Sequence, residues 1–187
     1  MRMMWKTGAV AGIALICAVL PTIAQDEGKT AAAELASSSK AALQQLYASA
    51  PLAKGLQAQA HAILVFPKVT KAGLGVGGQY GEGTLLKKGA PAGYYKTTGA
   101  SFGLQAGGQQ YGYAMFFMNP KALSDFESAT GFEVGVGPSV VLVDEGMAKT
   151  TTTNTMKDDI YAFTFGQKGL MAGLGIQGNK IKKITPK

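Results

Sequence analysis

The sequence predicts an α+β fold: a strongly curved, mainly antiparallel, glycine-rich β-sheet or small barrel, with two N-terminal helices and one crossing helix. Three observations predict this class. Residues 62–86 alternate large side chains with glycine at a period of two, the repeat of a β-strand. Similar alternation returns in residues 99–107, 132–142 and 169–176. Helical spacing of apolar residues appears in residues 30–60 and after Asn119.

The first residues have the pattern of an export signal. Arg2 and Lys6 precede an apolar run over residues 8–20, and a small residue, Ala24, closes the segment. We therefore expect a signal peptide over residues 1–24 and one domain over residues 25–187. An uncleaved anchor is the alternative, although the run is short for a bilayer. Lipidation of Cys17 is disfavoured because bulky Ile16 precedes it.

The composition of residues 25–187 limits the classes of partner. Removal of Arg2 and Lys6 leaves sixteen lysines against eleven acidic residues, with no arginine and no cysteine. Disulfides and thiolate metal sites are thereby excluded. Without the bidentate guanidinium group, sequence-specific nucleic-acid recognition is not expected. A moderate excess of lysine is suited to an anionic surface.

Two short helices, or one kinked helix, are expected before the first strand. Ser49 and Pro51 resemble a second helix start after residues 30–48. The favoured interpretation is that these helices cover one face of the sheet; the alternative is a membrane contact. The apolar residues of the first helix are Leu35, Leu43, Leu46 and Tyr47.

The first strand is expected to be short. Residues 63–66 form a continuous apolar run that predicts burial on both faces, and Pro67 is expected to end it. Lys68 and Lys71 would flank a turn before a glycine-alternating strand that reaches Leu86. Residues 87–89, with Pro91 and Gly93, predict a basic loop.

The rest of the chain predicts further strands and one helix. Large residues move from even to odd numbers between residues 101 and 117, which requires a bulge or a turn near Gly107 and Gly108. Asn119 and Pro120 predict the start of a helix that buries Leu123 and Phe126 and runs to about residue 129. Strands are expected at residues 94–98, 132–142, 161–165 and 170–176, whereas residues 147–157 fit an edge strand or a loop.

Two short motifs match enzyme fingerprints only as strings. Gly73, Gly75 and Gly78 have dinucleotide-binding spacing, but no helix start follows them. Ser101 lies in a nucleophile-elbow string that is followed by strand-like alternation, and the single histidine, His61, precedes it. Structural roles are favoured for both strings, and His61 is expected to end a helix. We expect no enzyme activity; a serine hydrolase using Ser101 is the less favoured alternative.

No metal or cofactor site is expected. His61 has no second histidine or cysteine as a partner in residues 25–187. The acidic pairs, Asp144 with Glu145 and Asp158 with Asp159, lack the ligand spacing of a calcium loop, and solvated turns are the favoured interpretation.

The lysines fall into three groups that are candidate contacts to phosphate headgroups. Each lysine near an anionic membrane contributes on the order of 1 kcal/mol, and turns at one end of a sheet would bring the groups together. Solubility alone is the simpler explanation for many of them. The candidates are Lys68 and Lys71; Lys87 and Lys88; and Lys180, Lys182 and Lys183, with Lys187 nearby.

The glycine-rich segments resemble the SYLF family of lipid-binding domains. The resemblance covers residues 63–67, 71–73, 77–83, 99–107 and 168–173, in the family's order. It implies phospholipid binding, with phosphoinositides as ligands in eukaryotic members, through an amphipathic N-terminal helix and basic residues. Exported bacterial members are single domains behind a signal peptide. This chain differs in having no arginine after residue 24 and only a weakly amphipathic first helix.

The expected function is therefore non-enzymatic binding of anionic phospholipid at the bacterial periplasm or cell envelope, by a peripherally membrane-associated protein. The alternative is a structural envelope protein or an outer-membrane barrel, since glycine-punctuated alternation also occurs there. Protein partners are left open.

Overall fold

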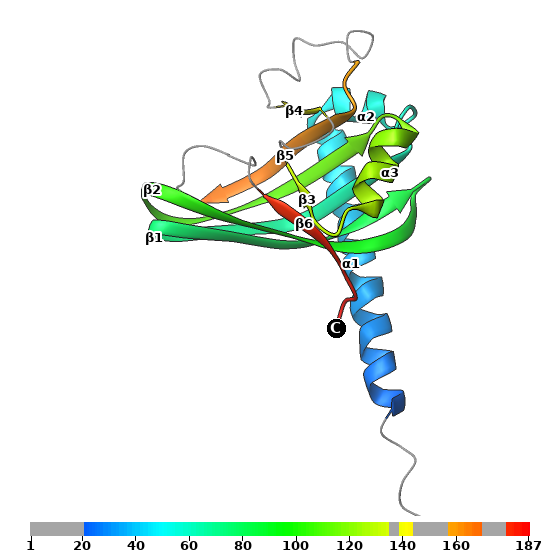
Figure 1. Cartoon of the computed structure of the whole chain (residues 1–187), viewed down its shortest axis with the longest axis horizontal. Helices are drawn as coiled ribbons and strands as arrows, with labels where there is room; N and C mark the ends of the chain where they lie inside the picture. Colours follow the sequence, from blue (N-terminus) through cyan, green and yellow to red (C-terminus); the bar gives the residue numbers. More distant parts are fainter. Residues whose placement is uncertain (1–20, 135–138, 144–156, 170–178) are drawn as a thin grey trace, which may run out of the picture.

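The computed structural model describes residues 21–134, 139–143, 157–169 and 179–187. These residues form three helices and six strands (Figure 1). In chain order they are α1 (Pro21–Ser49), α2 (Pro51–Leu56), β1 (Ala62–Lys87), β2 (Ala90–Phe117), α3 (Pro120–Ser128), β3 (Phe132–Glu133), β4 (Val140–Val143), β5 (Ile160–Gly169) and β6 (Lys180–Ile184).

A long hairpin of β1 and β2 organises the sheet. The two strands have 26 and 28 residues and pair in antiparallel fashion along their whole length. Lys88 and Gly89 form the turn, with φ values of 50° and 78°. Positive φ at both central residues is typical of a type I′ turn, whose twist matches that of the flanking strands. The predicted basic loop is therefore shorter than expected, because Pro91 and Gly93 already belong to β2.

The turn predicted between Lys68 and Lys71 is wrong. β1 continues through both residues, and Pro67 lies at a register shift between Phe66 and Val69. A bulge tolerates proline because the missing N–H is not needed in the ladder. The bulge predicted in β2 is confirmed: the register slips between residues 102 and 106, close to Gly107.

The hairpin takes part in two four-stranded halves of one curled sheet. In the first half, residues 109–117 of β2 pair with β5, and β4 pairs with β5 in parallel. In the second half, residues 94–98 of β2 pair with β6, which pairs with β3. One pairing is parallel and the others are antiparallel, so the α+β class with a curved, mainly antiparallel sheet is confirmed; the described strands form a half-barrel.

Glycines allow the two halves to approach closely. A Cβ on Gly81 would lie 2.8 Å from the carbonyl oxygen of Lys68 and 2.9 Å from Cγ2 of Val69. A Cβ on Gly83 would overlap the carbonyl oxygen of Val65 and lie 2.6 Å from the ring of Phe66. The bare face of β1 therefore packs against the first half of the same strand. We call the surfaces that face each other the interior and the opposite surfaces the outer face.

Helices cover the outer face and close the interior. Leu43, Leu46 and Tyr47 of α1 and Leu52 and Leu56 of α2 are buried against the outer face of the first half. The prediction that the N-terminal helices cover the sheet is confirmed, as is the break before Pro51. Helix α1 is longer than the predicted residues 30–48 because it already begins at Pro21.

Helix α3 joins the two halves of the sheet from within. The ring centroid of Phe126 lies 4.9 Å from that of Phe117 in the first half and 4.8 Å from that of Tyr95 in the second. The predicted cap is confirmed, since Oδ1 of Asn119 accepts a 2.8 Å hydrogen bond from the N–H of Ala122. The burial of aromatic surface from both halves explains why this short helix has a fixed place.

Other predictions for the second half of the chain need correction. The strand predicted at residues 132–142 is two strands, β3 and β4, which pair with β6 and β5 respectively. Strand β6 was not predicted, because three of its five residues are lysines and such a composition is typical of a surface segment. His61 precedes β1 instead of ending α2, and its N–H donates to the carbonyl of Phe117. The strand predicted at residues 170–176 and most of residues 147–157 lie outside the described residues.

Candidate anion-binding face

The outer face of the second half carries rows of polar residues across β1, β2 and β6. Residues directly opposite each other in adjacent strands share a face of the sheet. Glu82, Lys96 and Lys182 form one row. The rows on either side are Tyr80 with Thr98 and Lys180, and Thr84 with Tyr94 and Ile184.

Positive charge dominates these rows. Lys180 and Lys182 are exposed, and Lys96 is half-buried directly opposite Lys182. Two like charges in this position repel one another. Two ion pairs occur among the described residues, Lys87 with Glu127 and Lys121 with Asp125, and neither lies in these rows. The ammonium groups are thus available to an external anion.

Two acidic residues lie opposite these lysines, and neither forms an ion pair with them among the described residues. The hydroxyl of Tyr80 donates a short hydrogen bond to Glu82. This bond, with a smaller effect of burial, raises the pKa of Tyr80 to about 12, so the phenol is neutral at pH 7. Glu133 of β3 lies opposite Lys180. Tyr80 itself is 49% exposed, which places a large aromatic ring at the surface beside the lysines.

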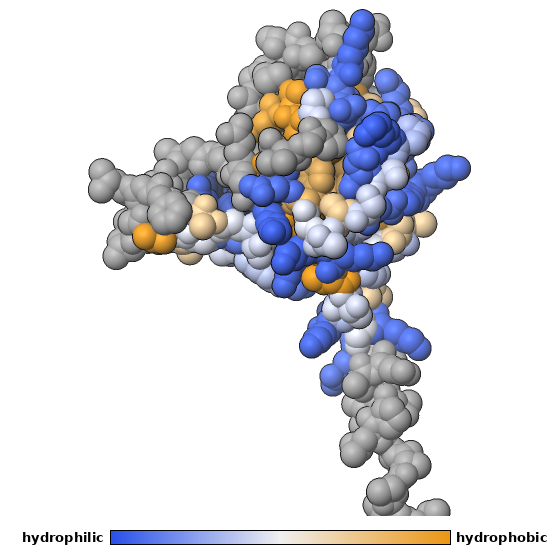
Figure 2. All heavy atoms as spheres, viewed as in Figure 1, coloured by the Kyte–Doolittle hydropathy of each residue, from blue (hydrophilic) through white to orange (hydrophobic). Residues whose placement is uncertain are grey.

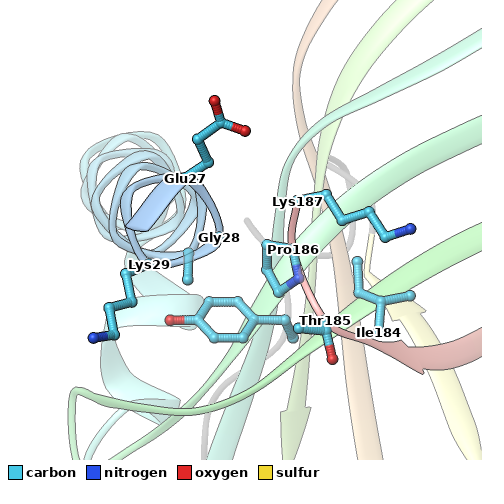
Figure 3. A pocket seen from close by; sticks show the side chains of 9 residues that line it. Glu27, Gly28, Lys29, Ile184, Thr185, Pro186 and Lys187 are labelled. Atoms are coloured by element: carbon cyan, nitrogen blue, oxygen red, sulfur yellow. The ribbon is translucent and has the colours of Figure 1, made fainter. Parts of the chain in front are cut away.

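A hollow adjoins the rows where α1 passes the end of β6. It has a volume of about 880 Å³, and a second hollow of about 400 Å³ shares Ile184, Thr185 and Lys187 with it. Figure 3 shows Gly28 of α1 and Pro186 on opposite walls of the larger hollow. Lys29 and Lys187 stand at its rim, and Glu27 is the acidic residue of its lining.

We define the basic face as these rows together with the rim of the hollow. On the side of the molecule drawn in Figure 2, hydrophilic side chains cover much of the described surface around small apolar patches. The basic face offers lysines to an anion, with the apolar lining of the hollow beside them. The lysines of the basic face are Lys29, Lys96, Lys180, Lys182 and Lys187.

The three lysine groups predicted from the sequence do not meet at one end of the sheet. Lys68 is exposed in the middle of β1, and Lys88 is exposed at the hairpin turn. Lys87 is 2.8 Å from the carboxylate of Glu127. Lys71 is only 5% exposed and faces the interior.

Of the three predicted lysine groups, the group on β6 lies beside lysines from other elements, namely those of the basic face. Lys183 is exposed but belongs to the row of Tyr95 and Gly83, on the other side of the sheet from Lys180 and Lys182. The sequence interpretation missed Lys29, Lys96 and Tyr80. Alternation within residues 94–98 could have placed Lys96 on one face of a strand, but only the pairing with β6 brings it to Lys182.

The residues predicted to contact a membrane from the first helix lie against the sheet. Leu43, Leu46 and Tyr47 are at most 7% exposed, and Leu35 is half-buried. Burial raises the pKa of Tyr47 to about 12. These side chains therefore contribute to the core, and their exposure to lipid would require α1 to leave the sheet.

The two motifs that match enzyme fingerprints and the acidic pairs are described only in part. Gly73 and Gly78 lie within β1, and no helix follows them. The side chain of Ser101 and the pair Asp144 with Glu145 lie outside the described residues. In the part of the chain that the structure describes, no three histidine, cysteine, aspartate or glutamate side chains are grouped so that they could hold a metal ion.

Asp159 ties the start of α3 to the segment before β4. Its carboxylate accepts a 2.7 Å hydrogen bond from Nδ2 of Asn119 and a 3.2 Å hydrogen bond from the N–H of Ser139. The bond from Asn119, followed by that from Ser139, lowers the pKa of Asp159 below the ordinary value of 3.8. Asp159, which was predicted to lie in a solvated turn, is partly exposed and also forms a hydrogen-bonded junction.

Within the described residues, no helix is both long enough and apolar enough to cross a membrane.

Comparison with known proteins agrees with the resemblance seen in the sequence. Residues 98–185 match the Ysc84 family model, described as Las17-binding protein actin regulator, and this confirms the SYLF resemblance over that part of the chain. The matched region contains most of β2 and all of β5 and β6, and therefore Lys180 and Lys182. No curated protein matches the chain.

Proposed function

We propose that this chain, which carries a SYLF (Ysc84) match over residues 98–185, binds anionic phospholipid through the basic face and performs no catalysis. The observation that carries the proposal is the pairing of Lys96 with Lys182, next to Lys180 on the same face. Lys96 lies between Glu82 on β1 and Lys182 on β6, and neither lysine has an ion-pair partner among the described residues. Like charges directly opposite one another destabilise a sheet, so a bound anion would offset the repulsion between the two lysines.

The chemistry of the basic face favours a lipid surface over a sequence-specific polyanion. Lysine acts as a mobile point charge on phosphate and lacks the fork by which arginine recognises bases. The apolar side chains Tyr94, Ile184 and Pro186 line the hollow beside the lysines, and Tyr80 is exposed there. Aromatic rings with a polar end are favoured at membrane interfaces. A peripheral position at the cell envelope follows from this proposal together with the predicted export signal.

Sedimentation with vesicles tests the proposed lipid binding. The protein is mixed with phosphatidylglycerol or phosphatidylcholine vesicles at low and at physiological salt, and the bound fraction is measured. We expect binding to the anionic vesicles only, weakening as salt rises. The absence of binding to phosphatidylglycerol at low salt would refute the proposal.

A double variant tests whether the basic face is the contact. Lys180→Gln with Lys182→Gln should weaken vesicle affinity on the order of thirty-fold, at about 1 kcal/mol for each lysine. The matched control is Lys40→Gln with Lys54→Gln, which removes the same charge from exposed positions on α1 and α2. Equal loss in both variants would show a general charge effect and remove the basic face from the proposal.

A further inference from the structure

The interior of the curled sheet contains polar side chains at one end of its apolar core. Lys71 of β1 and Gln109 of β2 lie directly opposite each other, and they are 5% and 3% exposed. They continue the interior row after Val69 and Tyr111, which are opposite each other and buried. An ammonium group has thus been placed where the sheet folds over on itself.

The second half of the sheet presents polar groups at the same level. Gly81 packs on Val69, so Gln79, two residues earlier on the same face, is brought to the level of Lys71. The hydroxyl of Tyr111 donates a 3.2 Å hydrogen bond to Oε1 of Gln79, which confirms that the halves meet here. Nε2 of Gln79 donates a short hydrogen bond to Oδ1 of Asn179.

Several buried polar atoms on the interior face of the sheet lack a hydrogen-bond partner. Among the described residues they include Oγ1 of Thr97, Oε1 of Gln109 and the hydroxyl of Tyr113. Gly81 is opposite Thr97 in the sheet, and Tyr113 is two residues from Tyr111 on the interior face. Each unpaired buried polar group costs about 1–3 kcal/mol, and native proteins seldom leave several together.

Lys71 also lacks a carboxylate partner. Neither of the two ion pairs among the described residues involves it. Most of the Lys71 side chain is buried, so an anion that entered beside its ammonium group would form a charge-assisted hydrogen bond that no described carboxylate supplies. Burial raises the pKa of Tyr113, so its hydroxyl stays protonated and can donate to such an anion.

We propose that the interior binds a small oxyanion bearing a hydroxyl group, of the hydrogenphosphate type, between Lys71, Gln109, Thr97 and Tyr113. Lys71 supplies the opposite charge, and the hydroxyls of Thr97 and Tyr113 donate to the anion's oxygens. The hydroxyl of the anion donates to Oε1 of Gln109, an atom that can only accept. This interior anion site is separate from the basic face, because Lys180 and Lys182 lie on the outer surface of the sheet.

Binding and thermal unfolding in the presence of inorganic phosphate test the proposal. We expect a saturable calorimetric binding signal and a saturable rise of the unfolding temperature in phosphate but not in sulfate of equal ionic strength, since sulfate has no hydroxyl at pH 7. An equal rise in both salts would be the general effect of excluded anions and would overturn the proposal.

Two variants of the site and one control separate it from surface charge. Lys71→Met should bind phosphate at least about tenfold more weakly, because the charge-assisted hydrogen bond is lost. Gln109→Glu places a carboxylate beside Lys71, so it should fold stably and no longer respond to phosphate. Lys68→Met, an exposed neighbour, should respond as the wild type does. A wild-type response in Lys71→Met or Gln109→Glu would overturn the site.

A lipid headgroup could supply the same phosphate chemistry. Short-chain phosphatidylglycerol in phosphate-free buffer is therefore a second probe. A response to inorganic phosphate identifies a free oxyanion, whereas a response to the lipid alone that Lys71→Met abolishes identifies a headgroup. No response to either probe refutes the interior anion site. The variant Lys180→Gln with Lys182→Gln should keep the response to phosphate. The proposals for the interior anion site and for the basic face can therefore be refuted separately.

Discussion

Substitution of Gly83 by alanine tests why one face of β1 is bare. Gly83 lies on the interior face, where β1 folds back over its own first half. A methyl group at this position would overlap the carbonyl oxygen of Val65 and lie 2.6 Å from Cδ1 and 2.9 Å from Cγ of Phe66. Both neighbours are fully buried, so neither can move into solvent.

The expected loss of stability is large. An extra methylene group in a packed core usually costs about 1–3 kcal/mol when side chains can adjust. Here one neighbour is backbone that also accepts a hydrogen bond from Ser39 Oγ, and the ring of Phe66 is stacked on Tyr113 with centroids 5.8 Å apart. We therefore expect Gly83→Ala to lower the free energy of unfolding by about 3 kcal/mol or more, a large part of a typical total of about 5–15 kcal/mol.

Urea denaturation followed by far-ultraviolet circular dichroism measures the free energy of unfolding of Gly83→Ala. Gly78→Ala is the matched control on the same strand, because its nearest neighbour would be the carbonyl oxygen of Gly99 at an ordinary 3.8 Å. The control should be neutral or stabilised by up to about 1 kcal/mol, since alanine reduces the entropy of the unfolded chain. Similar midpoints for the two variants would refute the close approach of the two halves of β1.

Three further predictions concern polar groups. Ser39→Ala should lower the free energy of unfolding by about 1–3 kcal/mol, because the buried hydroxyl is hydrogen-bonded to the backbone carbonyl of Val65 and to the hydroxyl of Thr84. Adding Thr84→Val should recover part of the loss, and denaturation curves showing no recovery would contradict this pairing. Lys182→Gln should raise the free energy of unfolding by about 0.2–1 kcal/mol by removing repulsion from Lys96, while it weakens vesicle binding; a loss of stability would contradict the repulsion. Asp159→Asn should flatten the acid limb of the stability profile. Because hydrogen bonds lower the folded-state pKa of Asp159, its contribution to stability is present above the unfolded value of 3.8 and is lost as pH falls through the lower, folded value. Equal acid sensitivity in the variant and the wild type would count against these hydrogen bonds.

Local patterns in the sequence determined the class of the fold and most of its elements. Alternation predicted extended chain in residues 62–86 because successive side chains of a strand point to opposite faces. Asn119 and Pro120 predicted the start of α3 because both act within one turn of the helix. The glycine-rich segments carried the resemblance to the SYLF family. Each of these signals involves residues close together in the chain.

Only the tertiary structure decided which residues form the two candidate sites. Lys96 and Lys182 are 86 positions apart, and their pairing depends on the place of β6 beside β2. Lys68 and Lys71 are three positions apart and look equivalent in the sequence, yet one is exposed and the other is buried. The difference arises because β1 bulges after Phe66 and then folds over itself. Strand register and curvature depend on contacts between distant segments, and local residue patterns do not contain them.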